Sequence, residues 1–313
     1  MLFRSEVILC GGAFNTPQLL QLSGIGPPEL LRRPDIDIEV RVPLRGVGAN
    51  LQDRYEVTVI SRMKQPFALL DGATMVPPAP GQGPDPQLRE WLDDKQGPYA
   101  TNGAVIAIIK RSKAAERAGR SAPDLFLFGL VTDFRGYYQG YSRDVQAAHQ
   151  YFTWAVLKGH TNNSNGRVAI RSNNPLDVPD IDFHYFEEGS PGSDEDLAAV
   201  VEAVQYVRDI SAGYQDIVAE ETQPGPSVQT PQQIGDFVRN QAWGHHASCT
   251  CKIGHPSDPE AVVDSKFRVI GTSNLRVVDA SVFPRIPGLF IVAAVYMIAE
   301  KASEDILAAA RAG

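Results

Sequence analysis

The side chains best suited to chemistry are gathered in one short stretch, HHASCTCKIG, at His245–Gly254. Two adjacent histidines precede a Cys-x-Cys pair, and His255 follows directly. Imidazole and thiol groups at this spacing are compatible with a zinc site, a reactive thiol, or a histidine base that takes a proton near neutral pH. The stretch alone does not choose between these three kinds of site.

A zinc site in this stretch would have the correct types of ligand. Its ligands would be drawn from His245 or His246, Cys249, Cys251 and His255. The Cys-x-Cys spacing does not easily present both sulfurs to one ion, so we expect no metal site. The two cysteines are most simply interpreted as small buried residues. A histidine pair that is merely packed in a core remains an alternative to a catalytic histidine.

Length and composition limit the class of protein. The chain has 313 residues, of which 43% are hydrophobic and 21% are charged, as in an ordinary globular protein. A net charge of −8 argues against a nucleic-acid partner. No apolar run approaches the roughly 20 residues of a membrane span, and no signal peptide is visible. Only three cysteines are present, which suits a reducing compartment, so we expect a cytoplasmic protein.

The elements that must position the chemistry begin at the N-terminus. Glu6–Cys10 (EVILC) is predicted to be a short buried strand, and two glycines after it permit a tight turn. Asn15 or Thr16 can cap a helix, with Pro17 in its first turn, and that helix should end within Ser23–Gly26. A strand, a glycine turn and a helix N-terminus can hold a phosphate or ribityl oxygen. A plain strand-turn-helix connection is the alternative.

The middle of the chain is rich in strand-like segments. Four of them are Gly103–Lys110, Asp124–Leu130, Tyr151–Leu157 and Gly166–Ser172, and Pro175–Phe186 is extended and punctuated by prolines. Asp194–Ser211 then has the spacing of an amphipathic helix. Successive strands with few helices between them predict an antiparallel sheet backed by helices.

The last seventy residues return to an α/β pattern. Leu275–Val278 is predicted to be a buried strand with Asp279 at its carboxyl end. Ligands bind beyond the carboxyl ends of strands in α/β sheets. A helix is predicted from about Ala293 onward, and its N-terminus would point toward the same edge.

Several of these segments together resemble one family. Gly12–Gly26 is similar to the second signature of the glucose–methanol–choline (GMC) oxidoreductases. Further segments resemble that family's conserved motifs in the same order: LRGVGANLQD at Leu44–Asp53, GHHASCTCKIG at Gly244–Gly254, NLRVVDASVFPRIPG at Asn274–Gly288, and MIAEKASEDIL at Met297–Leu307. The resemblance runs from residue 6 to about residue 308 and is closest to the choline dehydrogenase-like and alcohol oxidase-like members.

The resemblance implies an interleaved α/β (α+β) fold. One part would belong to a Rossmann-like FAD-binding domain formed by residues 1–54 and 243–313, and residues 55–242 would form a substrate-binding domain on an antiparallel sheet. The family's N-terminal ADP-binding βαβ unit, with its Gly-x-Gly-x-x-Gly turn, has no counterpart here. We therefore expect a C-terminal portion of a longer protein, whose missing N-terminal segment is needed for FAD and activity. A naturally short homologue is the alternative.

The resemblance also assigns roles to residues. The protein would be an FAD-dependent oxidoreductase that acts on the CH–OH group of an alcohol, with hydride passing to flavin N5, His246 as the base and His245 packed against the flavin. The electron acceptor, oxygen or another compound, stays open. A non-catalytic fragment and a flavin-containing lyase are the alternatives. The residues that the resemblance places at the cofactor are Gly12, Ala13, His245, Asp279, Ala280, Ile291 and Val292.

One position departs from the family pattern. Family members usually place a second His or Asn where this chain has Phe290, and a polar residue where it has Val292. Phenylalanine neither accepts nor donates a proton, so the second polar group must come from elsewhere, such as His245, or the substrate is held differently. The apolar run Leu289–Ile291 favours a hydrophobic or ring-bearing alcohol, with Phe290 as a substrate contact.

Overall fold

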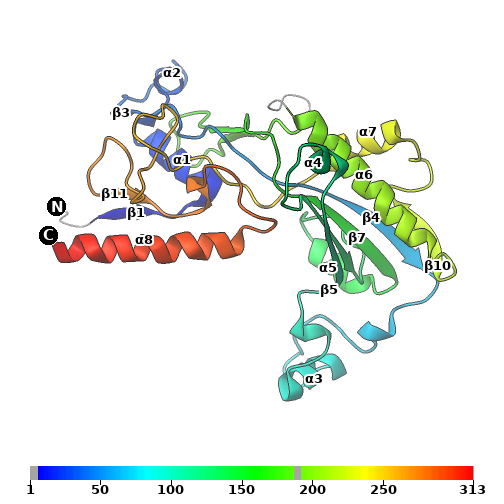
Figure 1. Ribbon diagram of the computed structural model, residues 1–313. Coiled ribbons are helices and arrows are strands. Elements are labelled where there is room, and N and C mark those ends of the chain that lie inside the picture. The colour runs from blue at the N-terminus through cyan, green and yellow to red at the C-terminus, as the bar shows by residue number, and fades with distance from the viewer. Residues whose placement is uncertain (1–5, 187–191, 313) are drawn as a thin grey trace. The chain divides into compact units, whose positions relative to one another are not determined.

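The chain packs as two compact units in a computed structural model that describes residues 6–186 and 192–312. Unit 1 comprises Met1–Arg54, His160–Asp196 and Gly244–Gly313, and unit 2 comprises Tyr55–Gly159 and Leu197–Trp243 (Figure 1). The prediction of a mixed α/β fold with an antiparallel sheet is confirmed. Residues 55–242 were predicted to form one substrate-binding domain, whereas His160–Asp196 pack within unit 1.

Short strand pairs make up the sheet structure of unit 1. The strand β1 (Val7–Leu9) pairs in parallel with β11 (Leu275–Val277), so residues near the two ends of the chain lie side by side (Figure 1). Two further pairs are parallel β2 (Ile25–Gly26) with β3 (Val42–Pro43) and antiparallel β8 (Arg167–Ala169) with β9 (Asp180–Asp182).

The strand β1 forms where it was predicted, but the prediction that it is buried is wrong. Val7 and Ile8 are 52% and 41% exposed. Among the described residues β1 pairs with β11 alone, so no second strand pairs with its other edge.

The helix α1 (Gly12–Leu22) starts earlier than Asn15 or Thr16, which were the predicted caps. Pro17 therefore lies inside the helix and has no N–H to donate to the carbonyl of Ala13, four residues before it. The hydroxyl of Thr250 donates to that carbonyl instead, at 2.7 Å. A residue from the far end of the chain thus satisfies the acceptor that proline leaves open.

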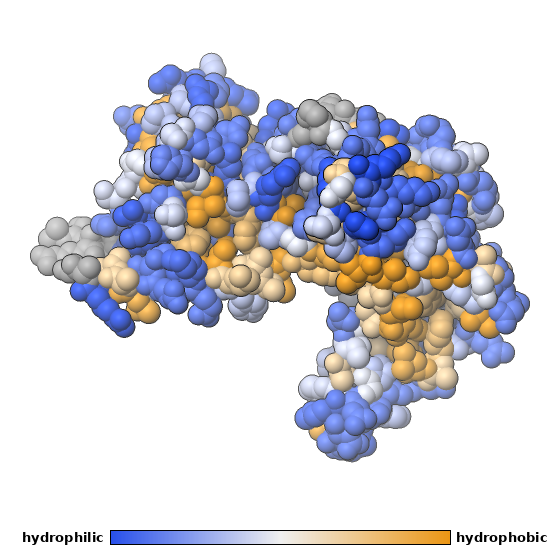
Figure 2. Space-filling model, viewed as in Figure 1, coloured by the Kyte–Doolittle hydropathy of each residue, from blue (hydrophilic) through white to orange (hydrophobic). Residues whose placement is uncertain are grey.

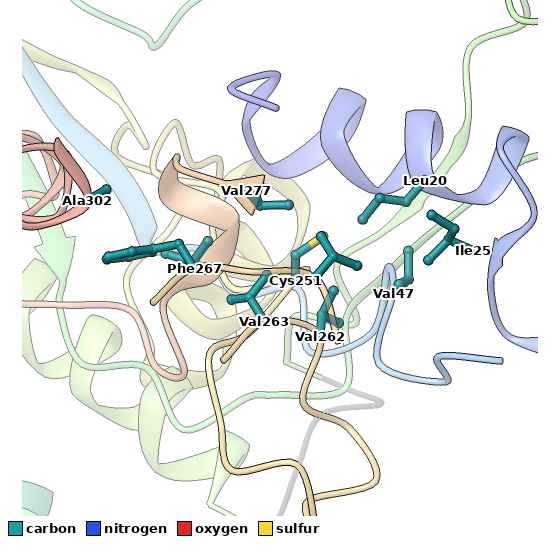
Figure 3. Packing of buried hydrophobic residues seen from close by; sticks show 11 residues of the cluster. Leu20, Ile25, Val47, Cys251, Val262, Val263, Phe267, Val277 and Ala302 are labelled. Carbon is teal, nitrogen blue, oxygen red and sulfur yellow. The ribbon is translucent and has the colours of Figure 1, made fainter. Parts of the chain in front are cut away.

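The main core of unit 1 lies between α1, the segment 247–269 and β11. Figure 3 shows Cys251 surrounded by apolar side chains from these elements, including Leu20, Val262 and Val277. The C-terminal helix α8 (Val292–Ala312) contributes Ala302 to the same cluster. The 3-10 turn η3 (Ala280–Val282) follows β11 directly.

Unit 2 is built on a five-stranded antiparallel sheet with the order β10-β4-β7-β6-β5. Its strands are β4 (Tyr55–Met63), β5 (Ala104–Lys110), β6 (Leu125–Leu130), β7 (Tyr151–Lys158) and β10 (Val218–Gln223). Three of them fall where strands were predicted, whereas β4 and β10 were not predicted. Figure 2 shows hydrophobic side chains gathered over this sheet, and Val105, Ile106 and Ile109 of the edge strand β5 are exposed.

The helix α6 (Ser193–Ala212) agrees with the predicted amphipathic helix to within one residue at each end. Its apolar side packs inward, because Val200, Val204 and Val207 are fully buried. Ion pairs connect it to the sheet on both sides, from Glu202 to Lys110 of β5 and from Arg208 to Glu221 of β10. The remaining helices are α2 (Pro28–Leu31), α3 (Pro86–Asp94), α4 (Lys113–Arg117), α5 (Tyr141–Ala147) and α7 (Pro231–Gln241), with 3-10 turns η1 (Ala68–Leu70) and η2 (Pro98–Ala100).

One buried charge network lies inside unit 2. Lys158, which is 1% exposed, places its ammonium 3.3 Å from the carboxylate of Asp124 and donates to the carbonyl of Gly159. The same carboxylate accepts hydrogen bonds from the backbone N–H and hydroxyl of Ser112. Across the described ranges, no helix combines the length and the apolar character required to cross a bilayer.

Candidate functional site

A hollow of about 290 Å³ opens at the N-terminus of α1 in unit 1. Its walls come from four separate segments of the chain: the turn before α1 with the first residues of that helix, the end of the segment 44–53, the residue after β9, and the histidine stretch. The lining residues are Gly11, Gly12, Ala13, Phe14, Asn15, Asp53, Phe183, Gly244, His245 and Ala247.

Gly12 forms the floor of this hollow with a conformation that favours glycine. Its φ is +76°, and a Cβ at this position would meet no atom within 4 Å, so the backbone faces open space. Its N–H donates to Oδ2 of Asp279 at 2.9 Å, and the hydroxyl of Thr16 donates to the same oxygen at 2.6 Å. The second oxygen of Asp279 accepts from the N–H of Ser281. Asp279 therefore joins the end of β11 to the start of α1 and caps η3.

Backbone hydrogen bonds on both sides hold the histidine stretch in place. Gln52 and Ser248 exchange two backbone bonds of 3.1 and 2.9 Å, and the N–H groups of Cys249 and Cys251 donate to the carbonyls of η3. Gly244 precedes the histidines where a Cβ would lie 2.5 Å from the carboxylate of Asp53. A larger residue there would displace the histidines that follow.

His246 is buried beside the hollow and carries no charge at neutral pH. Its ring lies 4.1 Å from that of His245 and packs edge-on against Phe290 at 5.6 Å. Burial, with smaller contributions from His245 and Arg54, lowers the pKa of His246 to about 3. Its Nδ1 is enclosed and makes no hydrogen bond to the described residues, which leaves Nε2 as the nitrogen on the open side. The ring is thus available as a neutral proton acceptor.

Asp53 is the carboxylate next to this histidine. Its Oδ1 accepts from the backbone N–H groups of Arg54 at 2.7 Å and His246 at 2.8 Å. Burial raises the pKa of Asp53 to about 6, although both hydrogen bonds and the charge of Arg54 oppose the shift. At pH 7 the group is mostly ionised, so it offsets positive charge on His246 when that ring takes a proton.

Arg54 is fully enclosed, with 0% of its surface exposed. Its Nη2 donates to the carbonyl of Pro287, while Nε and Nη1 have no hydrogen-bond partner among the described residues. Burial lowers the pKa of Arg54 to about 10, and the nearby Asp53 and Cys249 act in the opposite direction. A guanidinium remains charged at neutral pH at that value.

The two cysteines of the stretch occupy different apolar clusters. Cys249 packs with Phe283 and Ile286, whereas Cys251 lies in the main core of unit 1. Burial raises the pKa of the Cys249 thiol to about 12 and raises that of Cys251 as well. Within residues 6–186 and 192–312, no three His, Cys, Asp or Glu side chains are arranged to hold a metal ion.

Comparison with known proteins identifies the family of this site. Models of the GMC oxidoreductase family match residues 2–56 with their N-terminal part and residues 162–299 with their C-terminal part. The chain belongs to the GMC oxidoreductase family. Similar curated relatives include the oxygen-dependent choline dehydrogenase of Brucella ovis, 36% identical over 308 residues, which cover 97% of this chain and 52% of the relative. That of Staphylococcus haemolyticus is 38% identical, over 96% of this chain and 50% of the relative.

Solved GMC structures share the same fold. A variant of formate oxidase from Aspergillus oryzae aligns with a TM-score of 0.80 and 26% identity, over 97% of this chain and 54% of the oxidase. This GMC chain spans about half the length of the curated relatives and solved structures that it matches.

Several residues that the sequence singled out in this GMC chain lie together. Gly12, Ala13 and His245 line the hollow, His246 lies beside it, and Phe290 contacts His246. The other predicted residues lie behind or beyond the hollow: Asp279 and Ala280 connect β11 to η3, Ile291 packs with Cys249, and Val292 is exposed at the start of α8.

Two charged residues of the site were not predicted. Asp53 and Arg54 follow the GVGANLQ segment directly, and the sequence analysis used that segment only as a family motif. The only local signal was the adjacent acid and base at the end of that segment, directly before the strand β4.

Proposed function

We propose that this chain forms the catalytic part of an FAD-dependent oxidoreductase that oxidises the CH–OH group of an alcohol, with His246 as the base. The observation that carries the proposal is the neutral, buried imidazole of His246 beside a hollow at a glycine turn. Membership of the GMC family supports it, as do the alcohol-oxidising activities in the names of the relatives.

The residues present fit part of a flavin. Gly12 leaves a cradle that a Cβ would occupy, and the N-terminus of α1 supplies N–H groups of positive polarity beside it. Two buried polar atoms of the site, His246 Nδ1 and Arg54 Nη1, make no hydrogen bond to the described residues. In this proposal FAD is held by Gly12, Ala13, His245, Asp279, Ala280, Ile291 and Val292. A bound flavin would supply the two-electron acceptor for the hydride of the alcohol carbon.

The protein residues handle the proton. Nε2 of His246 takes the hydroxyl proton, because that nitrogen is on the open side of a neutral ring. The carboxylate of Asp53 fixes the backbone of His246 through a 2.8 Å hydrogen bond and offsets the charge of the imidazolium. The ring of Phe290 packs edge-on against this imidazole and gives it an apolar neighbour.

The preferred substrate in this proposal is a hydrophobic or ring-bearing alcohol. Phe290 stands edge-on to His246 and is 43% exposed, so its ring offers an apolar contact to a substrate that approaches the base. No hydrogen-bonding side chain occupies that position, which disfavours a small, strongly polar alcohol.

A cationic alcohol such as choline is a second candidate, because unit 2 contains a cluster of aromatic rings around a buried acid. The rings of Phe134, Tyr137, Tyr141 and Trp243 approach one another with centroids 5.1–6.4 Å apart. Glu56, which is 1% exposed, contributes to a raised pKa of Tyr137, after burial. Aromatic faces with a carboxylate favour a quaternary ammonium group. The choline dehydrogenases among the relatives agree with this candidate.

The partners and the compartment also belong to the proposal. The reduced protein would pass its electrons to oxygen or another acceptor. The ADP half of FAD would be held by a segment that corresponds to the part of the relatives that this chain does not span. Three free cysteines suit a reducing cytoplasm.

Anaerobic bleaching of the flavin tests the proposal in the FAD-loaded protein. Benzyl alcohol and choline, added separately, should distinguish the two substrate classes.

His246→Gln should slow the bleaching by roughly 10²–10⁴-fold, the usual effect of losing a general base. His255→Gln is the matched control, since His255 is exposed and bonds Ser257, and it should change little. Equal losses at both histidines, or no bleaching with any alcohol, would contradict the proposal.

A further inference from the structure

Arg54 combines two properties that are rarely found together. Its side chain is fully enclosed, yet two of its three guanidinium nitrogens make no hydrogen bond, and it forms no ion pair within 4.0 Å with the described residues. Removing a charged group from water costs several kcal/mol unless a partner compensates it. Buried polar groups without partners concentrate at functional sites, where an interaction other than fold stability retains them.

No carboxylate among the described residues bonds the guanidinium of Arg54 directly. Asp53 is adjacent, but its Oδ1 accepts from two backbone N–H groups, those of Arg54 and His246. The other ionisable groups that act on this cluster are His245, His246 and Cys249, with Arg285 acting on Cys249. The guanidinium lies close enough to both imidazoles to contribute to the lowered pKa values of His245 and His246.

The one hydrogen bond that the Arg54 side chain makes to the described residues has a specific location. Nη2 donates to the carbonyl of Pro287, three residues before Phe290. Gly288 follows with a φ of +57°, which turns the chain, and Phe290 then packs edge-on against His246. Arg54 thus holds the segment that brings Phe290 to the histidine.

We propose that Arg54 is a positioning residue for His246: its buried charge disfavours protonation of the imidazole, and its bond to Pro287 fixes Phe290 against the ring. This inference rests on the proposed function for its catalytic meaning. Two cations in a site of low dielectric repel each other strongly, so a fixed guanidinium disfavours imidazolium. The lowered pKa of His246, to which Arg54 contributes, agrees with this role. Arg54 also supplies a polar group close to Phe290, at whose position family members usually have a His or Asn.

NMR titration of the FAD-loaded protein labelled with ¹³C-histidine tests the charge effect without any substrate. The chain has six histidines, and His246→Gln identifies the signal of His246 by its loss. Arg54→Met should raise the midpoint of the His246 titration by roughly one to two pH units. Arg54→Lys should keep most of the original value, and the control Arg285→Met should leave it unchanged. Arg54→Gln serves as a second neutral variant if Arg54→Met does not fold.

The acid limb of kcat/KM gives the corresponding functional readout. It should move to higher pH in Arg54→Met, because His246 is a base only when it is neutral, and it should stay in place in Arg54→Lys. Arg54→Lys should still lower kcat several-fold, since a single ammonium does not reproduce the planar fork at Pro287. A His246 titration that is identical in wild type and both neutral variants would overturn the charge role, and an unchanged kcat in Arg54→Lys would overturn the positioning of Phe290. Absence of substrate-dependent bleaching in the wild type would instead refute the proposed function, and the NMR result would still decide the role of the charge.

Discussion

The two units each bury a cation, and the two cations are treated in opposite ways. Lys158 in unit 2 has a carboxylate at 3.3 Å and a carbonyl acceptor, and that carboxylate is itself bound by Ser112. Arg54 in unit 1 is buried as deeply, but its side chain has one hydrogen bond and no ion pair among the described residues. Burial alone therefore does not distinguish these two cations, whereas the satisfaction of their hydrogen-bonding groups does.

The contrast agrees with the positioning role that we propose for Arg54. The ion pair of Lys158 with Asp124, and the bonds of Asp124 to Ser112, join the end of β7 to the turn before α4. These interactions stabilise one arrangement of the sheet. Arg54 lies at the junction of the three segments that carry Asp53, His246 and Phe290. The guanidinium N–H groups of Arg54 that have no acceptor lower the stability of the fold. We expect Arg54 to be retained despite this loss because of its effect on the neighbouring imidazole.

The largest expected effect is on the satisfied network. Lys158→Met should lower the free energy of unfolding by about 3–5 kcal/mol, because it leaves the carboxylate of Asp124 buried without its cation. Urea denaturation followed by circular dichroism measures the change. The double variant Lys158→Met/Asp124→Asn should recover a large part of the loss. If the single variant is as stable as the wild type, the proposed distinction between the two cations fails.

Asp53→Asn should change the pH dependence of stability. The native pKa of Asp53 is about 6, above its ordinary value of 3.8, so ionisation of Asp53 removes stability as pH rises between about 4 and 6. The native pKa of His246 is about 3, below its ordinary value of 6.5, so the unfolded state binds the extra proton and stability rises with pH over the same range. In the wild type the two effects largely cancel.

With Asp53 replaced, the histidine effect remains alone. The stability of Asp53→Asn relative to wild type should then rise by about 2–3 kcal/mol between pH 4 and pH 6. Urea midpoints at a series of pH values give the difference between the two proteins. Parallel curves over this range would show that Asp53 does not titrate in the native site as described, and flat curves for Asp53→Asn would show the same for His246.

The smallest expected effect is that of Arg54→Met on stability. Methionine retains much of the volume and removes an uncompensated charge, so the loss of the Pro287 bond should be offset. We expect the free energy of unfolding to stay within about 1 kcal/mol of the wild type. A loss as large as that of Lys158→Met would mean that Arg54 is a structural cation after all.

The sequence predicted the parts of the fold that depend on local pattern. Three strands of the sheet and the helix α6 follow from apolar periodicity and fall within one or two residues of the predicted bounds. The start of α1 could not be predicted locally, because the hydroxyl that allows Pro17 inside the helix belongs to Thr250. The exposure of β1 was missed for a related reason, since an apolar run does not reveal how many neighbours a strand has.

The histidine stretch was recognised from its residue types, but the role of its neighbours was not visible. The environment of Arg54 depends on Pro287, 233 positions away, and on the fact that Asp53 uses its carboxylate on backbone groups. Neither relation has a signature in a single sequence. The sequence predicted that Phe290 departs from the family pattern and leaves a polar group missing. It did not indicate that the guanidinium of Arg54 lies nearby.

The pairing of β1 with β11 has a consequence for the order of folding. The bond from Gly12 to Asp279 joins positions 267 residues apart, and the segment between them includes all of unit 2. Contacts of such high sequence separation form slowly, because closing the intervening loop costs chain entropy first. During synthesis the apolar residues of β1 and α1 leave the ribosome long before their partners exist. We therefore expect nascent chains of this protein to depend on chaperones until β11 has been translated.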